Sequence, residues 1–269
     1  MVRGDGLFYR PTRHDYGSPE EFGLDYESVT FAASDGLRLH GWFFPATTGE
    51  PIGTVLHLHG NAGNVTGHFP FISWLPAAGW NVLCFDYRGY GRSEGRLTRE
   101  GTILDGHAAL DYLLTRDDVD DAGIVAFGQS LGGAVGIVLT ARRTEIRGLA
   151  TDGAFDHYQG IARWHVRRNP LLRAIAWWVP KLLMSNGHEP IDHVAKIAPR
   201  PVFIMHGAAD RVVDPAMAQR LYDAAGEPRE LWLLEDADHY EAIREFADEA
   251  QSRLLRFFEQ CVETAGVCS

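Results

Sequence analysis

Short apolar runs alternate with longer segments of helical periodicity along most of the chain. The apolar runs have the length and bounding residues of buried strands, and they cover residues 54–59, 81–87, 124–127, 148–152, 202–206 and 231–234. Helical patterns fall between and after them, at residues 69–78, 100–114, 131–142, 215–225 and 243–260. Strands that alternate with helices of this length are typical of an α/β protein with a doubly wound, mostly parallel sheet.

Two segments depart from this alternation. Residues 28–32 and 37–44 alternate apolar and polar positions around Ser34-Asp35-Gly36, which predicts an antiparallel pair joined by a turn. Residues 155–190 interrupt the strand–helix order late in the chain, and in this architecture such an insertion commonly forms a helical cap or lid. We therefore predict one α/β domain over residues 1–269, with residues 155–190 as the cap.

Composition and charge narrow the class of protein. With 269 residues and 45% hydrophobic content, the chain is long enough to bury a sizeable core. A net charge of −11 disfavours nucleic acid as a partner, because phosphate-binding surfaces are usually basic. The first six residues carry no apolar signal segment, no run approaches the ~18–20 apolar residues of a spanning helix, and three cysteines do not make a disulfide framework. These features predict a cytoplasmic protein.

A serine stands where a buried strand passes directly into a helix. Residues 123–132 read Gly-Ile-Val-Ala-Phe-Gly-Gln-Ser-Leu-Gly, so Ser130 ends the apolar run, with Gly128 and Gly132 on either side. Glycines at these two places let the strand and helix approach closely around a cramped turn. The turn lifts the serine hydroxyl above the helix N-terminus, where backbone N–H groups can meet a developing negative charge. Ser130 is therefore a candidate nucleophile, with the N–H of Leu131 as a candidate oxyanion donor.

An acid and a histidine follow in the order that serine hydrolases of the α/β type use. Asp210 follows the run at residues 202–206, and His239 follows the run at residues 231–234. Because the carboxyl ends of parallel strands meet at one edge of the sheet, we expect both side chains to lie near Ser130. Asp152 and Asp156, which follow the preceding strand, remain competitors for the role of the acid.

Several longer motifs resemble one known family. They are Phe22-Gly-Leu-Asp-Tyr-Glu27, Asp35-Gly-Leu-Arg-Leu-His-Gly-Trp42, His59-Gly-Asn-Ala-Gly-Asn64 and Phe85-Asp-Tyr-Arg-Gly-Tyr-Gly-Arg-Ser-Glu-Gly95. With Ser130, Asp210 and His239, they make the chain similar to α/β-hydrolases of the bud-emergence-suppressor-like group over nearly its whole length. The resemblance implies that the backbone N–H of Asn61 is the second oxyanion donor, with Ala62 as the alternative. Asp86 and Arg88 are expected to brace their loop.

These residues together predict a serine hydrolase. His239 would accept the proton of Ser130 while the hydroxyl attacks an acyl carbonyl, and Asp210 would hold the imidazole. An aromatic cap favours apolar acyl groups, and Trp164, Trp177 and Trp178 are its candidate substrate-binding residues.

The expected substrate is a small or lipid-like carboxylic ester or thioester. A peptidase or amidase with the same triad, or a catalytically silent binding protein on the same scaffold, remains an alternative. No cofactor is expected. No metal is expected either, because His57 and His59 lack a third ligand with convincing spacing. The basic and aromatic face of the cap also predicts a weak contact with anionic lipid surfaces.

Overall fold

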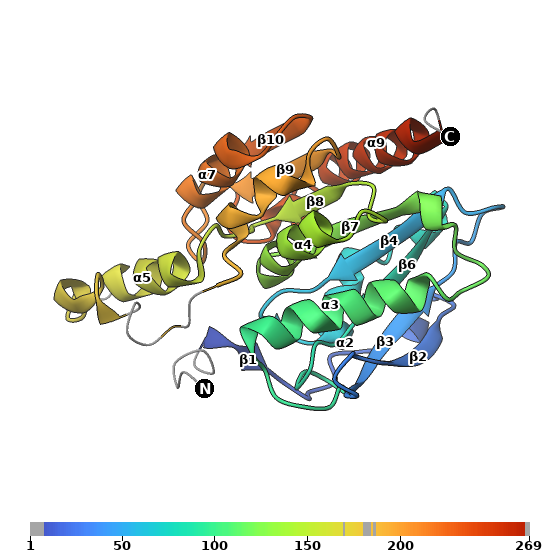
Figure 1. Ribbon diagram of the computed structural model, residues 1–269, viewed down its shortest axis with the longest axis horizontal. Coiled ribbons are helices and arrows are strands. Elements are labelled where there is room, and N and C mark those ends of the chain that lie inside the picture. Colours follow the sequence, from blue (N-terminus) through green and yellow to red (C-terminus); the bar gives the residue numbers. More distant parts are fainter. Residues whose placement is uncertain (1–7, 169, 180–183, 185–186, 267–269) are drawn as a thin grey trace.

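An eight-stranded sheet forms the centre of the molecule in a computed structural model that describes residues 8–168, 170–179, 184 and 187–266 (Figure 1). Its strand order is β10-β9-β8-β7-β4-β6-β3-β2. The strands are β2 (Glu27–Ala32), β3 (Arg38–Phe44), β4 (Gly53–Leu58), β6 (Trp80–Phe85), β7 (Ile124–Gln129), β8 (Leu149–Asp152), β9 (Val202–Gly207) and β10 (Arg229–Leu234). The sequence prediction of these eight strands is confirmed, with ends that agree to within two residues.

The sheet is parallel except at one side. Strands β4 and β6 to β10 pair in parallel, whereas β3 runs antiparallel to β6 and β2 antiparallel to β3. The predicted antiparallel pair is therefore confirmed and extends the parallel sheet. Because β7 to β10 are neighbours, their carboxyl ends lie side by side, which brings the loops after them to one edge.

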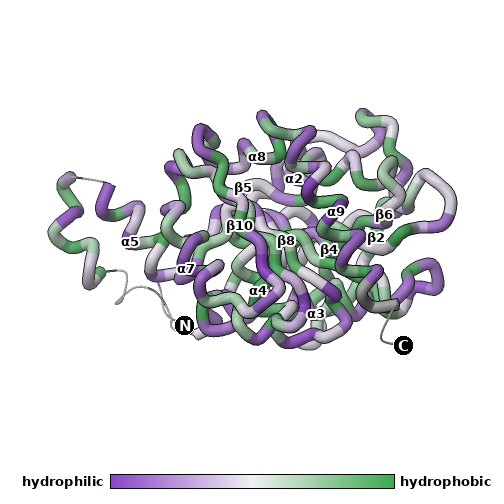
Figure 2. The backbone as a smooth tube through the Cα atoms, turned by 90° about the horizontal axis from the view of Figure 1, so that it is seen from above, coloured by the Kyte–Doolittle hydropathy of each residue, from purple (hydrophilic) through white to green (hydrophobic). Residues whose placement is uncertain are grey.

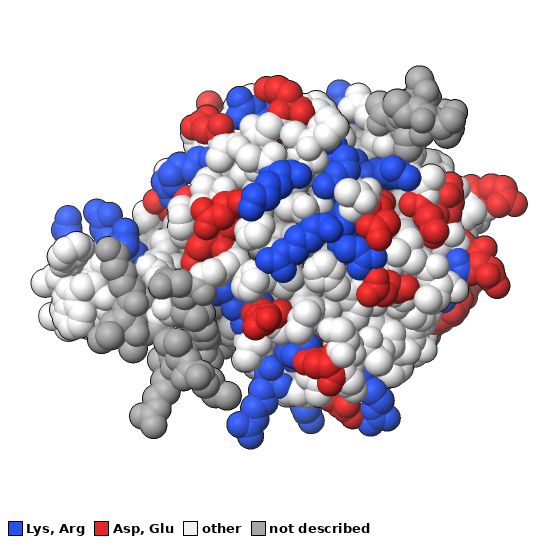
Figure 3. All heavy atoms as spheres, viewed as in Figure 1, with Lys and Arg blue, Asp and Glu red and all other residues white. Residues whose placement is uncertain are grey.

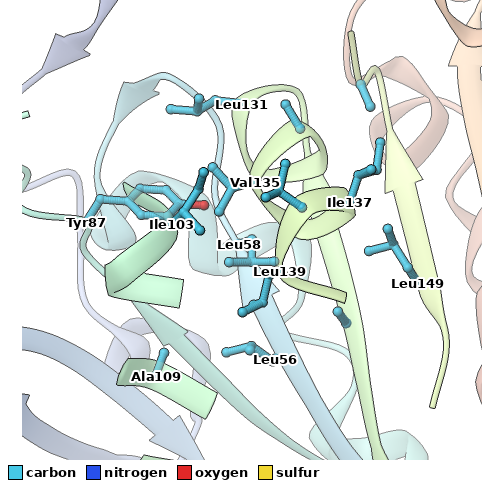
Figure 4. Packing of buried hydrophobic residues seen from close by; sticks show 14 of the residues in the cluster. Leu56, Leu58, Tyr87, Ile103, Ala109, Leu131, Val135, Ile137, Leu139 and Leu149 are labelled. Atoms are coloured by element: carbon cyan, nitrogen blue, oxygen red, sulfur yellow. The ribbon is translucent and has the colours of Figure 1, made fainter. Parts of the chain in front are cut away.

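Helices cover both faces of the sheet. Successive strand residues point to opposite faces, so Leu56 and Val55 of β4 enter different apolar clusters. Figure 4 shows Leu56 and Leu58 packed against Val135 and Leu139 of α4. The helices that flank the sheet are α3 (Arg99–Leu113), α4 (Leu131–Arg142), α7 (Ala216–Ala224) and α9 (Ala247–Gly266).

Two predicted helices are wrong in detail. Residues 69–78 form no continuous helix. They contain the short 3-10 segments η2 (Phe69–Phe71) and η3 (Pro76–Ala78), which follow the four-residue helix α2 (Val65–His68). Pro70 and Pro76 lack a backbone N–H and each stands in the first turn of its 3-10 segment, where that loss costs no hydrogen bond. The closing helix is also divided, into α8 (Glu241–Arg244) and α9.

The amino-terminal segment packs beside the loop after β4, which the sequence pattern did not predict. Strand β1 (Arg10–Pro11) pairs in parallel with β5 (Ala62–Gly63). The side-chain amide of Asn61 also donates a hydrogen bond of 2.7 Å to the carbonyl oxygen of Phe8. These contacts hold the loop that contains the predicted oxyanion donor.

The segment predicted as a cap projects from the sheet. Between β8 and β9 it forms α5 (Tyr158–Arg168) and η5 (Arg173–Ile175), followed by η6 (Pro190–Asp192) and η7 (Val194–Ile197). Figures 1 and 2 both show α5 extending beyond the sheet at one end of the molecule. In the part of the chain that is described, no helix has both the length and the apolar character needed to cross a membrane.

Candidate active site

Ser130 occupies a strained turn between β7 and α4. Its φ of 50° and ψ of −109° are values that side-chain-bearing residues rarely adopt. A Cβ atom at Gly132 would lie 1.8 Å from the carbonyl oxygen of Leu58, and one at Gly128 would lie 2.4 Å from the carbonyl oxygen of Gly132. The backbone N–H of Ser130 donates to the carbonyl oxygen of Asp152 at 2.8 Å. The predicted turn is therefore present, and it requires glycine on both sides.

Asp210 and His239 lie together in the loops after β9 and β10. His239 Nδ1 lies 2.7 Å from Asp210 Oδ2. The other carboxylate oxygen, Oδ1, accepts hydrogen bonds from the backbone N–H groups of Val212 and Val213 at 2.7 and 2.9 Å. The loop thus holds the Asp210 carboxylate in one orientation toward the imidazole.

The competing acids occupy other places. Asp156 pairs with Arg220 through Nε at 2.5 Å, away from His239. Asp152 is buried at the end of β8, and its backbone carbonyl accepts from Ser130. Of the three acids that the sequence left open, the structure pairs Asp210 with the histidine.

A second histidine, His206, also contacts Asp210 and was missed by sequence reasoning. Its Nε2 atom lies 3.2 Å from Asp210 Oδ2, and the side chain is fully buried at the end of β9. Burial alone would raise the pKa of Asp210, but hydrogen bonds from His206 and His239 outweigh it and hold that pKa well below its usual range. Asp210 therefore stays ionised wherever the protein is folded at ordinary pH.

Tyr240 is a further residue that the sequence analysis did not identify. It follows His239 directly, has a φ of 64°, and its ring lies over the imidazole with 4.1 Å between centroids. Burial raises the pKa of its hydroxyl, and contact with the Ser130 side chain opposes that shift in part. A Cβ atom at Gly60 would lie 2.0 Å from this hydroxyl, so the Tyr240 hydroxyl lies between the serine and the loop after β4.

The two predicted oxyanion donors belong to the segment next to Ser130 and to the loop after β4. Leu131 is the first residue of α4, where a backbone N–H has no acceptor within the helix. Asn61 is held by its side chain, which contacts Phe8 and accepts from the backbone N–H of Arg10 at 3.1 Å and from the Tyr90 hydroxyl at 2.9 Å. The Tyr90 hydroxyl oxygen also lies 2.7 Å from the Asn61 backbone carbonyl oxygen, so its single proton is shared between these two acceptors. These contacts hold the loop in place, and Asn61 and Ala62 line the cavity above Ser130.

The motif at residues 85–95 has a structural place beside this loop. Asp86 accepts from the backbone N–H groups of Val65 and Arg92, and Arg88 binds Asp105 and Asp35. The prediction that Asp86 and Arg88 brace their loop is confirmed.

A cavity of about 590 Å³ opens above Ser130. Its lining is mainly apolar and comes from the amino-terminal segment, the loop after β4, the cap and the loops that carry the triad: Phe8, Arg10, Asn61, Ala62, Ser130, Ile161, Ala162, His165, Val166, Val179, Met184, Val212, His239 and Tyr240. Cavities of this size with a mainly apolar lining are typical of sites that bind small molecules. The structure therefore brings Ser130, His239 and Asn61 to one apolar cavity.

The three cap tryptophans lie outside this cavity. Trp164 lines a second cavity of about 450 Å³ on the other side of α5, whereas Trp177 and Trp178 are 67% and 47% exposed. Apolar side chains such as Ile161 and Val166, on the same helix as Trp164, face Ser130 instead. The tryptophans in the sequence indicated an aromatic cap but did not indicate which face of the cap lines the cavity above Ser130.

The two strand histidines are held by the fold. His57 Nε2 lies 3.1 Å from Gln129 Oε1, and His59 Nδ1 lies 2.7 Å from the Gly60 carbonyl oxygen. Burial lowers the pKa of each to about 3. Within the described residues, no group of three or more histidine, cysteine, aspartate or glutamate side chains is arranged to hold a metal ion.

A profile of the alpha/beta hydrolase fold matches residues 53–183. WAV2 of Arabidopsis thaliana, an alpha/beta hydrolase domain-containing protein, is 35% identical over 77% of this chain and 69% of its own length. The chain belongs to the α/β-hydrolase family.

Other members of the family show which group it resembles. YfhR of Salmonella typhi is 36% identical over 94% of this chain and 87% of YfhR. Protein bem46 of Schizosaccharomyces pombe is 28% identical over 82% of this chain and 73% of bem46, which confirms the resemblance to the bud-emergence group. The esterase Pf2001 of Pyrococcus furiosus superposes with a TM-score of 0.79 at 24% identity, covering 94% of this chain and 99% of that chain, and so shares the fold.

A buried acid beside the triad makes the stability of this α/β-hydrolase depend on pH. The Asp152 side chain is buried, and its Oδ2 atom has no hydrogen-bond partner in the part of the chain that is described. Burial raises the pKa of Asp152 to about 6. The folded protein therefore binds this proton more tightly than the unfolded chain, and the stability associated with it is lost as pH rises toward 6.

We expect the free energy of unfolding of Asp152→Asn, relative to that of the wild type, to be higher at pH 8 than at pH 5. The wild type loses about 1–2 kcal/mol between these pH values through this group, and the neutral amide does not. Urea unfolding of both proteins at the two pH values measures the difference. Any packing cost of the amide is the same at both pH values, so it cancels when the two differences in unfolding free energy are compared. An equal difference between variant and wild type at pH 5 and pH 8 would contradict the buried-charge explanation.

Proposed function

We propose that this chain is a serine hydrolase that cleaves carboxylic esters or thioesters of apolar acyl groups through an acyl-enzyme on Ser130. The observation that carries the proposal is the 2.7 Å contact between His239 Nδ1 and Asp210 Oδ2 beside a serine on a strained turn. The fold that it shares with an esterase of Pyrococcus furiosus agrees with this chemistry.

The protonation states of Asp210 and His239 determine which atom acts as the base. Because Asp210 is ionised and faces Nδ1, the neutral imidazole of His239 carries its proton there, and Nε2 is the free base. Nε2 takes the proton of the Ser130 hydroxyl as the oxygen attacks the acyl carbonyl. The proton then passes to the leaving alcohol or thiol as its bond to the acyl carbon breaks. Water, deprotonated by the same base, hydrolyses the acyl-enzyme and restores Ser130.

The negative charge of the tetrahedral intermediate needs fixed donors. The N–H groups of Leu131 and Asn61 are the proposed pair, and the contacts of Asn61 with Phe8, Arg10 and Tyr90 keep the second donor from moving. A donor that is already oriented costs no reorganisation during the reaction. One such donor is typically worth about 10²–10³ in rate.

Apolar acyl groups are favoured by the lining of the cavity. Ile161, Val166, Val179 and Met184 line it on the cap side, and Phe8 and Val212 add to them. Burial of each methylene is worth about 0.8 kcal/mol, or nearly fourfold in kcat/KM if it is fully realised. The mainly apolar lining offers little polar surface to a sugar and few charged groups to a highly charged substrate.

A series of p-nitrophenyl esters from acetate to palmitate tests the proposal. We expect kcat/KM to rise severalfold for each added methylene on short chains and to level off once the cavity is filled. A preference for acetate would contradict an apolar acyl site. Absence of turnover on every ester would favour the peptidase or silent-scaffold alternative.

A further inference from the structure

The far end of the cap combines exposed apolar side chains with cations. Leu171, Leu172, Trp177 and Trp178 are 92%, 40%, 67% and 47% exposed, so four of the large hydrophobic side chains at the surface gather within eight residues. Arg168 precedes them in the sequence by three residues, and Arg173 stands between Leu172 and Trp177. We call these six residues the cap tip.

The charge of this region is opposite to that of the whole protein. Residues 157–188 contain five cations and no aspartate or glutamate, whereas the chain carries a net charge of −11. Figure 3 shows the protruding end of the molecule with white and blue atoms and no red among them. A negatively charged partner is therefore expected to bind at this basic and apolar tip and to be repelled by the acidic remainder of the protein.

The cap tip is continuous with the cavity above Ser130. Val166 lines the cavity two residues before Arg168, and Val179 lines it directly after Trp178. Figures 1 and 2 both show the segment after α5 at the extremity of the molecule, where it can touch a flat surface without interference from the sheet. A surface that meets the tip would therefore lie beside the cavity.

We propose that the cap tip docks on lipid bilayers that contain anionic headgroups. Tryptophan and leucine side chains insert at the boundary between headgroups and acyl chains, while arginines bind the lipid phosphates. A bilayer fits better than an acidic protein because the apolar side chains stand on a protruding tip. Such a tip inserts into the deformable surface of a bilayer more readily than into a groove of fixed shape on a protein. Docking itself is independent of the proposed hydrolase activity, but the consequence that acyl substrates enter from the bilayer rests on that activity.

Flotation with vesicles of phosphatidylcholine, with and without phosphatidylglycerol, tests the docking. We expect the wild-type protein to float with the anionic vesicles, to float less in high salt, and to remain unbound with phosphatidylcholine alone. Arg168→Gln/Arg173→Gln is expected to weaken partitioning by about 30-fold, which corresponds to about 1 kcal/mol for each cation. Trp177→Ala/Trp178→Ala is expected to weaken it by at least about tenfold.

The matched control removes two arginines elsewhere. Arg244→Gln/Arg256→Gln changes exposed residues of α8 and α9 and should leave flotation unchanged. Thermal unfolding of every variant shows that the fold is retained. Failure of the wild type to float with anionic vesicles, or equal flotation of the control and both cap-tip variants, would overturn the proposal.

The two proposals fail separately. A protein that floats but hydrolyses no ester would keep the docking surface and contradict the hydrolase activity. A protein that hydrolyses soluble esters but does not float would keep the hydrolase and contradict the docking.

Discussion

Replacing Ser130 by alanine is expected to lower kcat on a soluble short-chain ester by roughly 10⁴-fold or more. The hydroxyl oxygen is the atom that bonds to the acyl carbon, and alanine has no atom that can form this bond. KM should change far less, because the lining of the cavity is untouched. Steady-state hydrolysis of p-nitrophenyl butyrate by the purified proteins measures the effect.

The Ser130→Ala variant should fold as the wild type does. Alanine has a Cβ atom as serine does, so the cost of a φ of 50° is carried by both residues. The backbone N–H at this position keeps its hydrogen bond to the Asp152 carbonyl oxygen. A thermal midpoint close to that of the wild type is the control. If turnover survives in a folded variant, Ser130 is not the nucleophile.

Replacing Asp210 by asparagine is expected to lower kcat by about 10⁴-fold through the tautomer of His239. The backbone donors of Val212 and Val213 bind Oδ1, so the amide oxygen of asparagine takes that place and its NH₂ group faces the histidine. The imidazole must then accept at Nδ1 and carry its proton on Nε2, where it cannot receive the proton of Ser130.

The matched control for Asp210→Asn is Asp156→Asn. It makes the same chemical change at an acid that binds Arg220 and not the histidine, so activity should stay within about threefold of the wild type. The pair of variants is compared by kcat on the same soluble ester, with thermal unfolding of each protein. Equal losses in both variants, or a larger loss in Asp156→Asn, would contradict the choice of Asp210.

The order of strands and helices could be predicted from the sequence because β4 and β6 to β9 are buried at every residue and are therefore mainly apolar, whereas β2 alternates exposed and buried positions. The run at residues 124–127 and the glycines beside Ser130 also predicted the turn, since a Cβ atom at either glycine would overlap backbone atoms. Asp210 and His239 could be placed because the carboxyl ends of β9 and β10 are neighbours in a parallel sheet.

Other features depend on contacts between distant parts of the chain. The pairing of β1 with β5 joins two residues on each side and leaves no periodic pattern to find. His206 appeared to be an ordinary strand residue, and its contact with Asp210 appears only when the loop after β9 folds back. Tyr240 was overlooked because nothing in its sequence position showed that its hydroxyl returns to Ser130.

The orientation of the cap helix α5 could not be predicted either. The sequence indicated an aromatic insertion but could not say which side of α5 faces the serine, because that helix carries both Trp164 and apolar residues such as Ile161 and Val166. In the structure, Ile161 and Val166 face the cavity, while Trp164 lines the second one. Side-chain direction on a cap helix is decided by how the helix packs on the body of the protein, and periodicity does not determine it.

Labelling with a p-nitrophenyl alkylphosphonate tests the central claim most directly. Such a compound transfers its phosphonyl group to an activated serine and releases nitrophenol, so the bond that forms marks the nucleophile. We expect mass spectrometry to find one adduct per chain, on the peptide that contains Ser130, and none in the Asp210→Asn protein on the same timescale. An adduct on another residue, or no reaction with the folded wild-type protein, would contradict the account.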